Sequence, residues 1–474
     1  MENRDRLFYQ YALMNLAVLQ ADFGCLKEAV AAMLETVSTA RESRDNTCLN
    51  FALNWLFHFG RVHPRLVGEL ESNSMLGSGK ESLGYLRVKA RESGMWTLWI
   101  SALLSDAKMG LSNGDSIATS LEFMARSSQV LVERNMKNMT GAQMTLSIAI
   151  WDRLGLARLS SMACDIFLKC HAQNAPSDDQ LKTTCRLAGH LAGRGRYDEA
   201  IRRLEAIDAN TLRSWKSNQY WQKYRGLLKL RRELHRNDLD ATGFLLSDLL
   251  QGKPDDLEPD IAFVVDSLHV ECLIRRGDLQ AAFAKVEQLL LEHKEGENDI
   301  SLRVRLLLIK AHLYDEAGRP QRGFSLAMRA ASLSWRARLV PLLWQAVGSL
   351  ANILTSLGEF AAAVRLLLPV IPRCLECEAS FMVAQLYSWL ADAHMGMAGA
   401  QLGGNSSGRA DCMARAADAL EQAFQYYAAV EDVERQCEMR EKQATIAKAS
   451  GEEELAEKYA AQYMAIRRGQ LVGT

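Results

Sequence analysis

Residues 191–207 read LAGRGRYDEAIRRLEAI, and residues 350–368 read LANILTSLGEFAAAVRLLL. In each stretch a glycine separates two segments whose apolar residues recur at helical spacing, which predicts a helix, a tight turn and a second helix. The same turn position returns every 40 to 42 residues, at Gly114, Gly155, Gly195, Asn237, Gly277, Gly318 and Gly358. A fixed period in this range indicates an array of stacked helical pairs.

Residues at constant offsets from the turn share one chemical character. Seven residues before the turn the side chain is apolar: Ala107, Ile148, Ala188, Leu230, Val270, Ala311 and Ala351. Five residues after the turn the residue is small: Thr119, Ser160, Ala200, Thr242, Ala282, Gly323 and Ala363. Nine residues after the turn the side chain is again apolar: Phe123, Cys164, Leu204, Leu246, Val286, Ala327 and Leu367. These offsets predict buried positions on both helices and a close approach between them.

The same frame occurs near both ends of the chain, around Gly24 and Gly451, where it is similar to the 34-residue tetratricopeptide motif. We predict an all-α fold, a tetratricopeptide-like α-α superhelix (solenoid) built from helical pairs of about 40 residues. Because the central period exceeds the motif by about two helical turns, we expect each helix of a pair to be about one turn longer.

Breaks in the pattern suggest how the chain is divided. We expect a first tetratricopeptide-like repeat and a following helix over residues 7–60, an irregular Gly- and Ser-rich connection over 61–84, and an elongated helical-pair array over 85–397. An inserted loop is expected at 398–409, and C-terminal helical repeats at 410–468.

Composition points away from several classes of partner. The formal net charge is −1, which provides no global attraction to nucleic acid or to a membrane, and we expect neither as a partner. The uncharged run 339–358 is long enough to cross a bilayer, but polar residues such as Gln345 and Asn352 favour a buried soluble helix. Ten irregularly spaced cysteines are typical of free thiols in a reducing compartment.

No stretch of the sequence carries a convincing catalytic, cofactor-binding or metal-binding motif. GSGKES at 77–82 lacks the first glycine of a phosphate-binding loop and has glutamate after the lysine. Cys374 and Cys377 form a single CxxC without the second ligand pair that a structural zinc site needs. We therefore expect a protein that is not an enzyme and that uses no cofactor and no metal.

The most suggestive surface segment is RSWKSNQYWQKYRGLLKLRRELHR at 213–236, where basic and aromatic residues alternate. Its candidate docking residues are Trp215, Lys216, Tyr220, Lys223, Arg225, Arg231 and Arg232. A solvated helix face is the favoured interpretation; a docking site for an acidic partner segment comes second, and contact with nucleic acid comes last.

The segment at 11–61 carries a more specific sequence pattern than the repeats do. It matches the pattern A-L-x-N-L-A-x-L-x-x-x-F-G-x-x-x-E-A at Ala12, Leu13, Asn15, Leu16, Ala17, Leu19, Phe23, Gly24, Glu28 and Ala29. It continues with Ala40, Glu42, Asp45, Cys48, Leu49, Trp55 and Leu56. This block resembles the anaphase-promoting complex subunit 5 family at the start of its helical-repeat region.

The resemblance implies a non-catalytic scaffold subunit of the anaphase-promoting complex/cyclosome, a cullin-RING E3 ubiquitin ligase that controls mitotic progression. It further implies contacts with other subunits of that complex, platform subunits 1 and 4 among them, and a location in nucleus and cytoplasm. Family members carry a helical region before these repeats, so the chain is similar to their C-terminal half. The alternative is a helical-repeat adaptor or signalling protein that binds peptide or protein partners.

Overall fold

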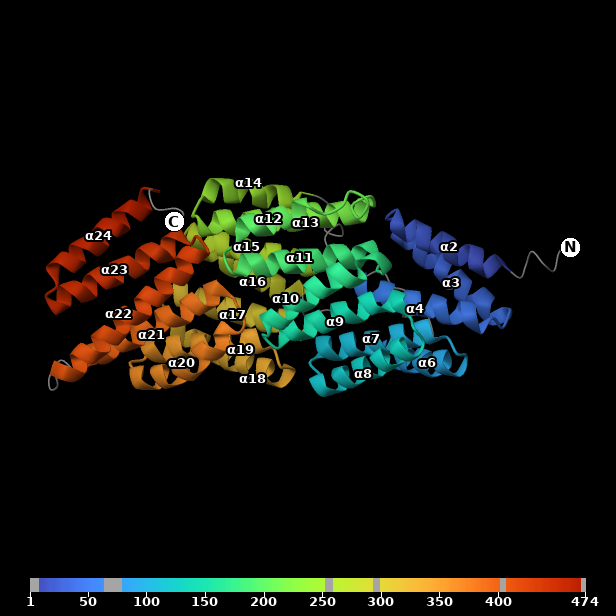
Figure 1. Ribbon diagram of the computed structural model, residues 1–474, viewed down its shortest axis with the longest axis horizontal. Coiled ribbons are helices and arrows are strands. Elements are labelled where there is room, and N and C mark those ends of the chain that lie inside the picture. The colour runs from blue at the N-terminus through green and yellow to red at the C-terminus, as the bar shows by residue number, and fades with distance from the viewer. Residues whose placement is uncertain (1–7, 64–78, 252–258, 293–298, 401–405, 470–474) are drawn as a thin grey trace. The chain divides into compact units, whose positions relative to one another are not determined.

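Helices make up the fold throughout the part of the chain that the computed structural model describes, residues 8–63, 79–251, 259–292, 299–400 and 406–469. Within these ranges there are 22 α-helices and no strands, which confirms the all-α prediction (Figure 1). No helix in these ranges combines the length and apolarity needed to span a membrane. The chain divides into two compact units, one up to Leu146 and one from Ser147.

The helices of the first unit follow one another as antiparallel neighbours. They are α2 (Tyr9–Asp22), α3 (Leu26–Glu42), α4 (Asn46–Val62), α6 (Gly79–Glu92), α7 (Trp96–Asn113), α8 (Ile117–Glu133) and the first part of α9 (Thr140–Arg153), preceded by the short η2 (Lys137–Met139). Residues 64–78 of the expected connection at 61–84 lie outside the described residues, and helix α6 already begins at Gly79.

The second unit continues the same arrangement of helical pairs. Its helices are α10 (Ala157–Ile166), α11 (Ser177–Gly193), α12 (Tyr197–Glu205), α13 (Trp215–His235), α14 (Leu239–Leu250), α15 (Pro259–Arg275), α16 (Leu279–Glu292), α17 (Ile300–Glu316), α18 (Phe324–Ala337), α19 (Val340–Ser356), α20 (Phe360–Leu375), α21 (Ser380–Ala400), α22 (Ser406–Ala429), α23 (Val433–Ser450) and α24 (Glu453–Arg467). A π-helical segment η3 (Phe167–His171) and the 3-10 turns η4 (Ala172–Asn174) and η6 (Pro320–Gly323) complete it. Of the expected loop at 398–409, residues 401–405 lie outside the described residues, and α21 and α22 extend into its two edges.

The predicted turn residues adopt the left-handed backbone conformation that a turn between two helices favours. All six glycines of the series have φ between +68° and +87°, and Asn237 has φ +59°. A left-handed residue ends the first helix of each pair, and glycine adopts this conformation without the steric cost that a side chain brings. The apolar residues seven positions earlier are all buried.

One repeat departs from the predicted offsets. Helix α8 begins three residues after Gly114, whereas the following helix begins two residues after the other turns. The extra residue moves the buried small position from Thr119, which is exposed, to Ser120, whose hydroxyl donates to the carbonyl oxygen of Ala107 at 3.2 Å. Met124 is buried one position after Phe123 for the same reason.

The expected lengthening is uneven. The first helices α11, α13, α15, α17 and α19 have 17 to 21 residues, but the second helix α12 has only nine. The remaining residues of that repeat form the turns at 206–214, where Ser214 accepts a hydrogen bond from the Ser217 amide and starts α13. The prediction of one additional turn per helix is therefore wrong for α12.

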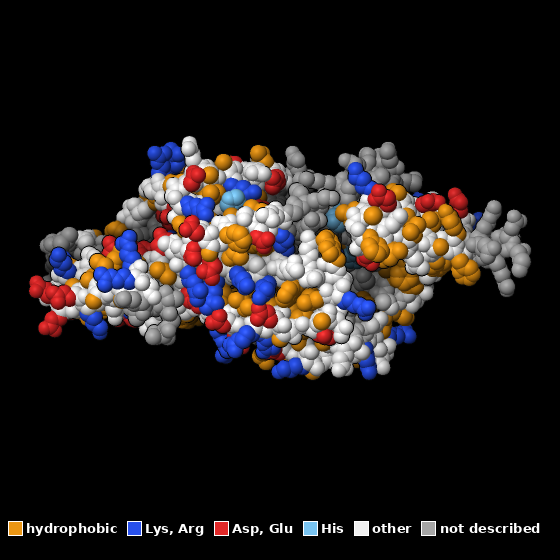
Figure 2. Space-filling view, turned by 90° about the horizontal axis from the view of Figure 1, so that it is seen from above, with side chains coloured by type: hydrophobic (Ala, Val, Ile, Leu, Met, Phe, Trp, Pro, Cys, Tyr) orange, Lys and Arg blue, Asp and Glu red, His pale blue; other side chains and the backbone are white. Residues whose placement is uncertain are grey.

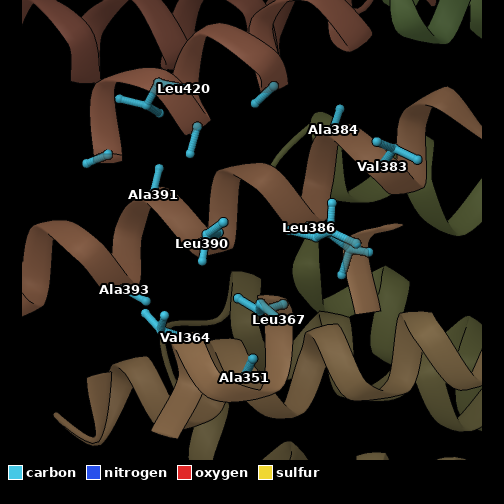
Figure 3. Packing of buried hydrophobic residues seen from close by; sticks show 14 of the residues in the cluster. Ala351, Val364, Leu367, Val383, Ala384, Leu386, Leu390, Ala391, Ala393 and Leu420 are labelled. Atoms are coloured by element: carbon cyan, nitrogen blue, oxygen red, sulfur yellow. The ribbon is translucent and has the colours of Figure 1, made fainter. Parts of the chain in front are cut away.

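Small residues bring the helices of the C-terminal core close together. Ala351, Ala384 and Ala391 are fully buried among Leu367 and Leu386 (Figure 3). Alanine at these positions lets the backbones approach while leucine fills the remaining volume, as the ridge-and-groove packing of helices requires.

Candidate functional site

Turns far apart in the sequence meet along one line of the second unit. We call these contacts the seam: the C-terminal ends of the first helices α9, α11, α13 and α15 lie against the turns at 337–341, 376–378 and 429–432. Arg194, at the end of α11, forms an ion pair with Glu378, which precedes α21. The amide of Ala157 donates to the carbonyl oxygen of Glu376 at 3.3 Å. The seam therefore joins residues that are 157 to 219 positions apart in the sequence.

Glu431 lies at the next point of the seam where helix ends meet a distant turn. We call each such point a crossing. Its carboxylate accepts hydrogen bonds from Arg232 at 2.9 Å and from Arg236 at 2.6 Å. Burial favours the neutral acid, but the two guanidinium groups outweigh it and hold the pKa of Glu431 below its ordinary value. Glu378 and Glu431 both have left-handed backbones, with φ of +48° and +62°. The seam thus uses two glutamates in a conformation that usually favours glycine.

A glycine and a histidine complete this crossing. A Cβ atom on Gly195 would lie 1.8 Å from the carbonyl oxygen of Ala429, so only glycine fits there. The Nδ1 atom of buried His235 lies 3.1 Å from the carbonyl oxygen of Val430 and donates to it, since a carbonyl can only accept. Burial lowers the pKa of His235, which keeps the ring neutral.

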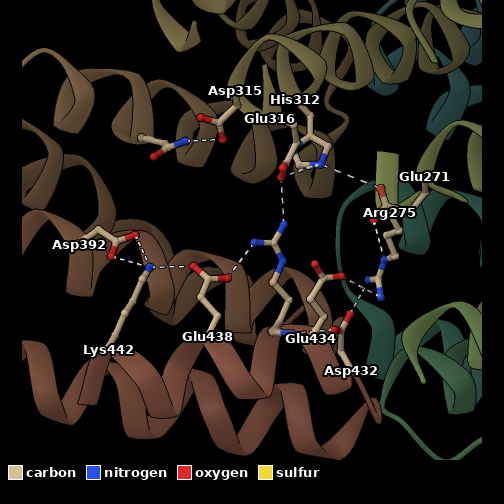
Figure 4. A network of polar contacts seen from close by, with 12 residues as sticks. Glu271, Arg275, His312, Asp315, Glu316, Asp392, Asp432, Glu434, Glu438 and Lys442 are labelled. Atoms are coloured by element: carbon tan, nitrogen blue, oxygen red, sulfur yellow. Dashed lines mark hydrogen bonds and ion pairs between the residues drawn. The ribbon is translucent and has the colours of Figure 1, made fainter. Parts of the chain in front are cut away.

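A network of charged side chains connects α23 with helices α15, α17 and α21 in the second unit (Figure 4). Helix α23 faces α15, α17 and α21 there. Arg275 binds Asp432 at 2.7 Å, and their side chains are 5% and 0% exposed. Arg435 binds Glu316 at 3.1 Å. Lys442 binds Asp392 at 2.7 Å. These ion pairs connect α15, α17 and α21 to α23 and to Asp432, the residue that precedes it.

A small polar cavity remains within this network. Its volume is about 140 Å³, and its lining includes His312, Asp315 and Asn352. Asn352 donates to Asp315 at 2.7 Å, and burial raises the pKa of the Asp315 carboxyl. Within the described ranges no group of three or more His, Cys, Asp or Glu side chains could hold a metal ion. The network is arranged to hold helices in place.

The structure places the basic residues of the predicted docking patch mainly against the protein itself. The ammonium of Lys223 donates to the carbonyl oxygens of Asp248, Leu249 and Gln251 at 3.1 to 3.2 Å. Arg225 pairs with Glu205. Arg232 pairs with Asp198 at 2.8 Å in addition to its contact with Glu431.

The other patch residues divide into packed and exposed ones. The Tyr220 ring stacks on Tyr224 with centroids 6.2 Å apart, and Arg231 is half-buried. Trp215 is 68% exposed, and the neighbouring Lys216 is exposed as well. Only these two residues of the set present a free surface, so docking by this patch stays a prediction that concerns the start of α13.

Sequence reasoning missed the seam, although one signal for it exists. Arginine recurs one or two positions before the turn residue, at Arg153, Arg194, Arg236, Arg275 and Arg276. A cation near a helix C-terminus is favourable in itself. The recurring arginines therefore have a local explanation, and the sequence gives no indication of their distant partners.

A separate feature lies in the first unit, on helix α2. Leu16 and Leu19 on this helix share one face with Phe8 and Phe23, the residues that flank its two ends, and the four are between 45% and 77% exposed. Figure 2 shows hydrophobic side chains gathered over this unit. Exposed apolar side chains that share one helix face are a candidate surface for contact with a partner. We call it the α2 stripe.

Comparisons with known proteins agree with the motifs in this region. A family model described as anaphase-promoting complex subunit 5 matches residues 1–63. The chain is 28% identical over 316 residues to anaphase-promoting complex subunit 5 of Schizosaccharomyces pombe, covering 66% of this chain and 41% of that protein. It is 21% identical over 440 residues to the Homo sapiens protein of the same name, covering 90% and 54%. The chain thus spans about half the length of the curated relatives it matches.

Solved structures with related architecture are only distantly similar. A monomeric mutant of IFIT1 with Gppp-AAAA aligns over 96% of this chain and 95% of that one, at 12% identity and a TM-score of 0.37. BtubC from P. vanneervenii aligns over 55% and 94%, at 17% identity and a TM-score of 0.34. Neither likeness bears on function. By these sequence matches, the chain is similar to anaphase-promoting complex subunit 5.

Proposed function

We propose that the chain is a non-catalytic scaffold subunit of the anaphase-promoting complex/cyclosome, a cullin-RING E3 ubiquitin ligase that controls mitotic progression. Its similarity to subunit 5 of that complex supports this assignment. The partners we propose are other subunits of the complex, with platform subunits 1 and 4 among them, and the location is nucleus and cytoplasm.

The α2 stripe is the observation that carries the proposal furthest. It lies inside the region that the family model matches, and it exposes large apolar side chains at the spacing of one helix face. Permanent subunit interfaces are more apolar than transient ones, so such a stripe fits a protein that stays assembled.

The test compares two variants in dividing cells. Leu16→Glu combined with Leu19→Glu places charges in the α2 stripe, while Phe244→Glu changes a 75% exposed side chain on α14. We expect the tagged wild type and Phe244→Glu to copurify the ligase subunits in stoichiometric amounts, and the double variant to lose them while keeping its helical circular dichroism. Wild type that recovers a single cargo or a transcription factor, without ligase subunits, would favour the adaptor alternative.

The same purification addresses the docking patch. We propose that Trp215 and Lys216 contact an acidic partner segment, because they are the exposed members of that set. Replacing both with alanine should weaken recovery of one subunit and leave the others in place. Unchanged recovery of every subunit would assign these residues to a solvated helix face.

A further inference from the structure

A second cavity, larger than the one inside the charged network, lies in the seam. Its volume is about 420 Å³, and it lies where Gly155, in the turn after α9, faces Arg338, between α18 and α19, and Arg373 near the end of α20. Pockets that bind ligands have volumes of roughly 300–1,000 Å³, so this one can take one or two side chains of a peptide.

Charge is unmatched at this crossing of the seam. At the other crossings the left-handed turn residue is Glu378 or Glu431, and arginines from the facing helix ends bind it. Here the left-handed residue is Arg338, with φ +54°. Among the described residues neither Arg338 nor Arg373 has an acidic partner. The seam therefore presents two guanidinium groups where its other crossings present a neutralised carboxylate.

Further donors in and beside the cavity lack acceptors. The hydroxyl of Ser334, which is fully buried, and the indole Nε1 of Trp344 both line the cavity, and neither has a partner in the described structure. Beside them, Arg153 donates its Nε to the carbonyl oxygen of Ala337 at 2.9 Å, and its Nη2 is left without a partner. These atoms are closed off from solvent, so the donors that the cavity presents to a ligand are the guanidinium groups of Arg338 and Arg373. Glu376 also lines the cavity, and Asp299 acts electrostatically on Arg153, so the three arginines outnumber the two carboxylates.

An aromatic surface adjoins the two arginines. Trp335 is 57% exposed, and the guanidinium of Arg338 lies over its ring, 4.4 Å from the centroid. Stacking on an indole leaves the donors at the edge of a guanidinium free, in the planar fork that binds a carboxylate with two hydrogen bonds. The ring beside it can cover an apolar side chain.

We propose that this cavity binds an acidic peptide segment of a partner subunit. A carboxylate of the segment binds Arg338 and Arg373, and a neighbouring apolar side chain packs on Trp335. The inference rests on the proposed scaffold function for the source of the segment, but the cavity's preference for carboxylates is a property of this chain alone.

The experiment measures peptide binding to the purified full-length chain by fluorescence anisotropy. The probe is a labelled hexapeptide Glu-Asp-Leu-Glu-Asp-Phe, and its Gln-Asn-Leu-Gln-Asn-Phe counterpart is the reference. Arg338→Asn with Arg373→Gln removes the charges of the cavity, and asparagine tolerates the left-handed backbone. Arg336→Asn with Arg365→Gln is the control, since it removes the same charge from exposed arginines of α18 and α20 that lie outside the cavity lining.

We expect the acidic peptide to bind at least tenfold more tightly than its amide counterpart, and the cavity variant to lose at least tenfold in affinity. The control variant should stay within twofold of wild type. Equal binding of both peptides, or equal losses in both variants, would overturn the proposal. No ligase subunit takes part in the peptide measurement, so the two proposals can fail separately. Selective peptide binding together with failed copurification from cells contradicts only the scaffold function. Successful copurification without selective peptide binding contradicts only the cavity assignment.

Discussion

Gly195 shows what the seam demands of a single residue. It shares its left-handed backbone with Gly277, where φ is +80°, but a Cβ there would meet nothing within 4 Å, whereas at Gly195 it would meet the Ala429 carbonyl oxygen. A non-glycine residue in this conformation costs about 1–2 kcal/mol, and overpacking costs about 1–3 kcal/mol more. We expect Gly277→Ala to lose about 1 kcal/mol and Gly195→Ala about 3 kcal/mol or more in urea unfolding followed by circular dichroism. Similar losses in the two variants would show that the seam is not packed as described.

Glu431 gives the seam a pH dependence. Its pKa lies below the ordinary value in the folded chain, so its contribution to stability is complete above the ordinary glutamate pKa of about 4.3 and is lost as the pH falls through the folded pKa. Hydrogen bonds to charged groups contribute about 1.5–3 kcal/mol. We expect Glu431→Gln to be less stable than wild type by about this amount at neutral pH. The gap between the two proteins should close as the pH falls below about 4, and a gap that stays constant with pH would contradict the pairing with Arg232 and Arg236.

At the scale of elements, helix α21 contains two glycines in contrasting surroundings. A Cβ on Gly396 would lie 2.2 Å from the Phe360 ring of α20, while one on Gly399 would meet nothing within 4 Å. Alanine is favoured over glycine inside a helix by up to about 1 kcal/mol. Gly399→Ala should therefore raise the thermal midpoint slightly. Gly396→Ala should lower it through an overpacking cost of about 1–3 kcal/mol that exceeds the helix gain, and a rise in both variants would mean that Phe360 moves aside freely.

The elements also show why a period predicts helices better than it predicts their lengths. The 42-residue interval from Gly195 to Asn237 is the longest in the series, yet α12 is the shortest helix of the array, with nine residues. Turn-forming residues such as Asp208 and Asn210 stop it, because their side chains offer hydrogen bonds that compete with the helix. The spacing is preserved because the connection and α13 take up the remaining residues.

At the scale of the second unit, the buried pair of Arg275 and Asp432 holds α23 against the repeats that precede it. Arg275→Ala leaves the Asp432 carboxylate buried without its cation, which costs about 3–5 kcal/mol. Hydrogen exchange should rise in the turn at 429–432 and at the end of α13. Lys310→Ala is the control, because its partner Glu287 is 55% exposed and such pairs contribute about 0–1 kcal/mol. Equal hydrogen exchange in the two variants would contradict a stabilising role of the Arg275–Asp432 pair in the second unit.

The candidate site was predictable to a lesser degree than the fold. Trp215 and Lys216 are exposed as a docking surface requires, but Lys223, Arg225 and Arg232 bind groups of the chain itself. A basic side chain on a helix looks the same in sequence whether its partner is solvent, another protein or a glutamate 199 residues away. For that reason charge patterning alone does not separate the exposed members of the segment from those paired within the chain, and docking by this patch stays a prediction.

The sequence by itself determined the helical pairs, the left-handed turn at every 40 to 42 residues and the buried positions on either side of it. Each of these follows from local rules: helical periodicity, the freedom of glycine and asparagine at positive φ, and the space available between two adjacent helices. Only the tertiary structure decided that Gly195 meets Ala429, that Glu431 binds Arg232 and that the cavity beside Arg338 remains unneutralised. These contacts depend on the rotation from one repeat to the next, summed over about five repeats, and a rotation of this kind leaves no mark on the spacing of residues within a repeat.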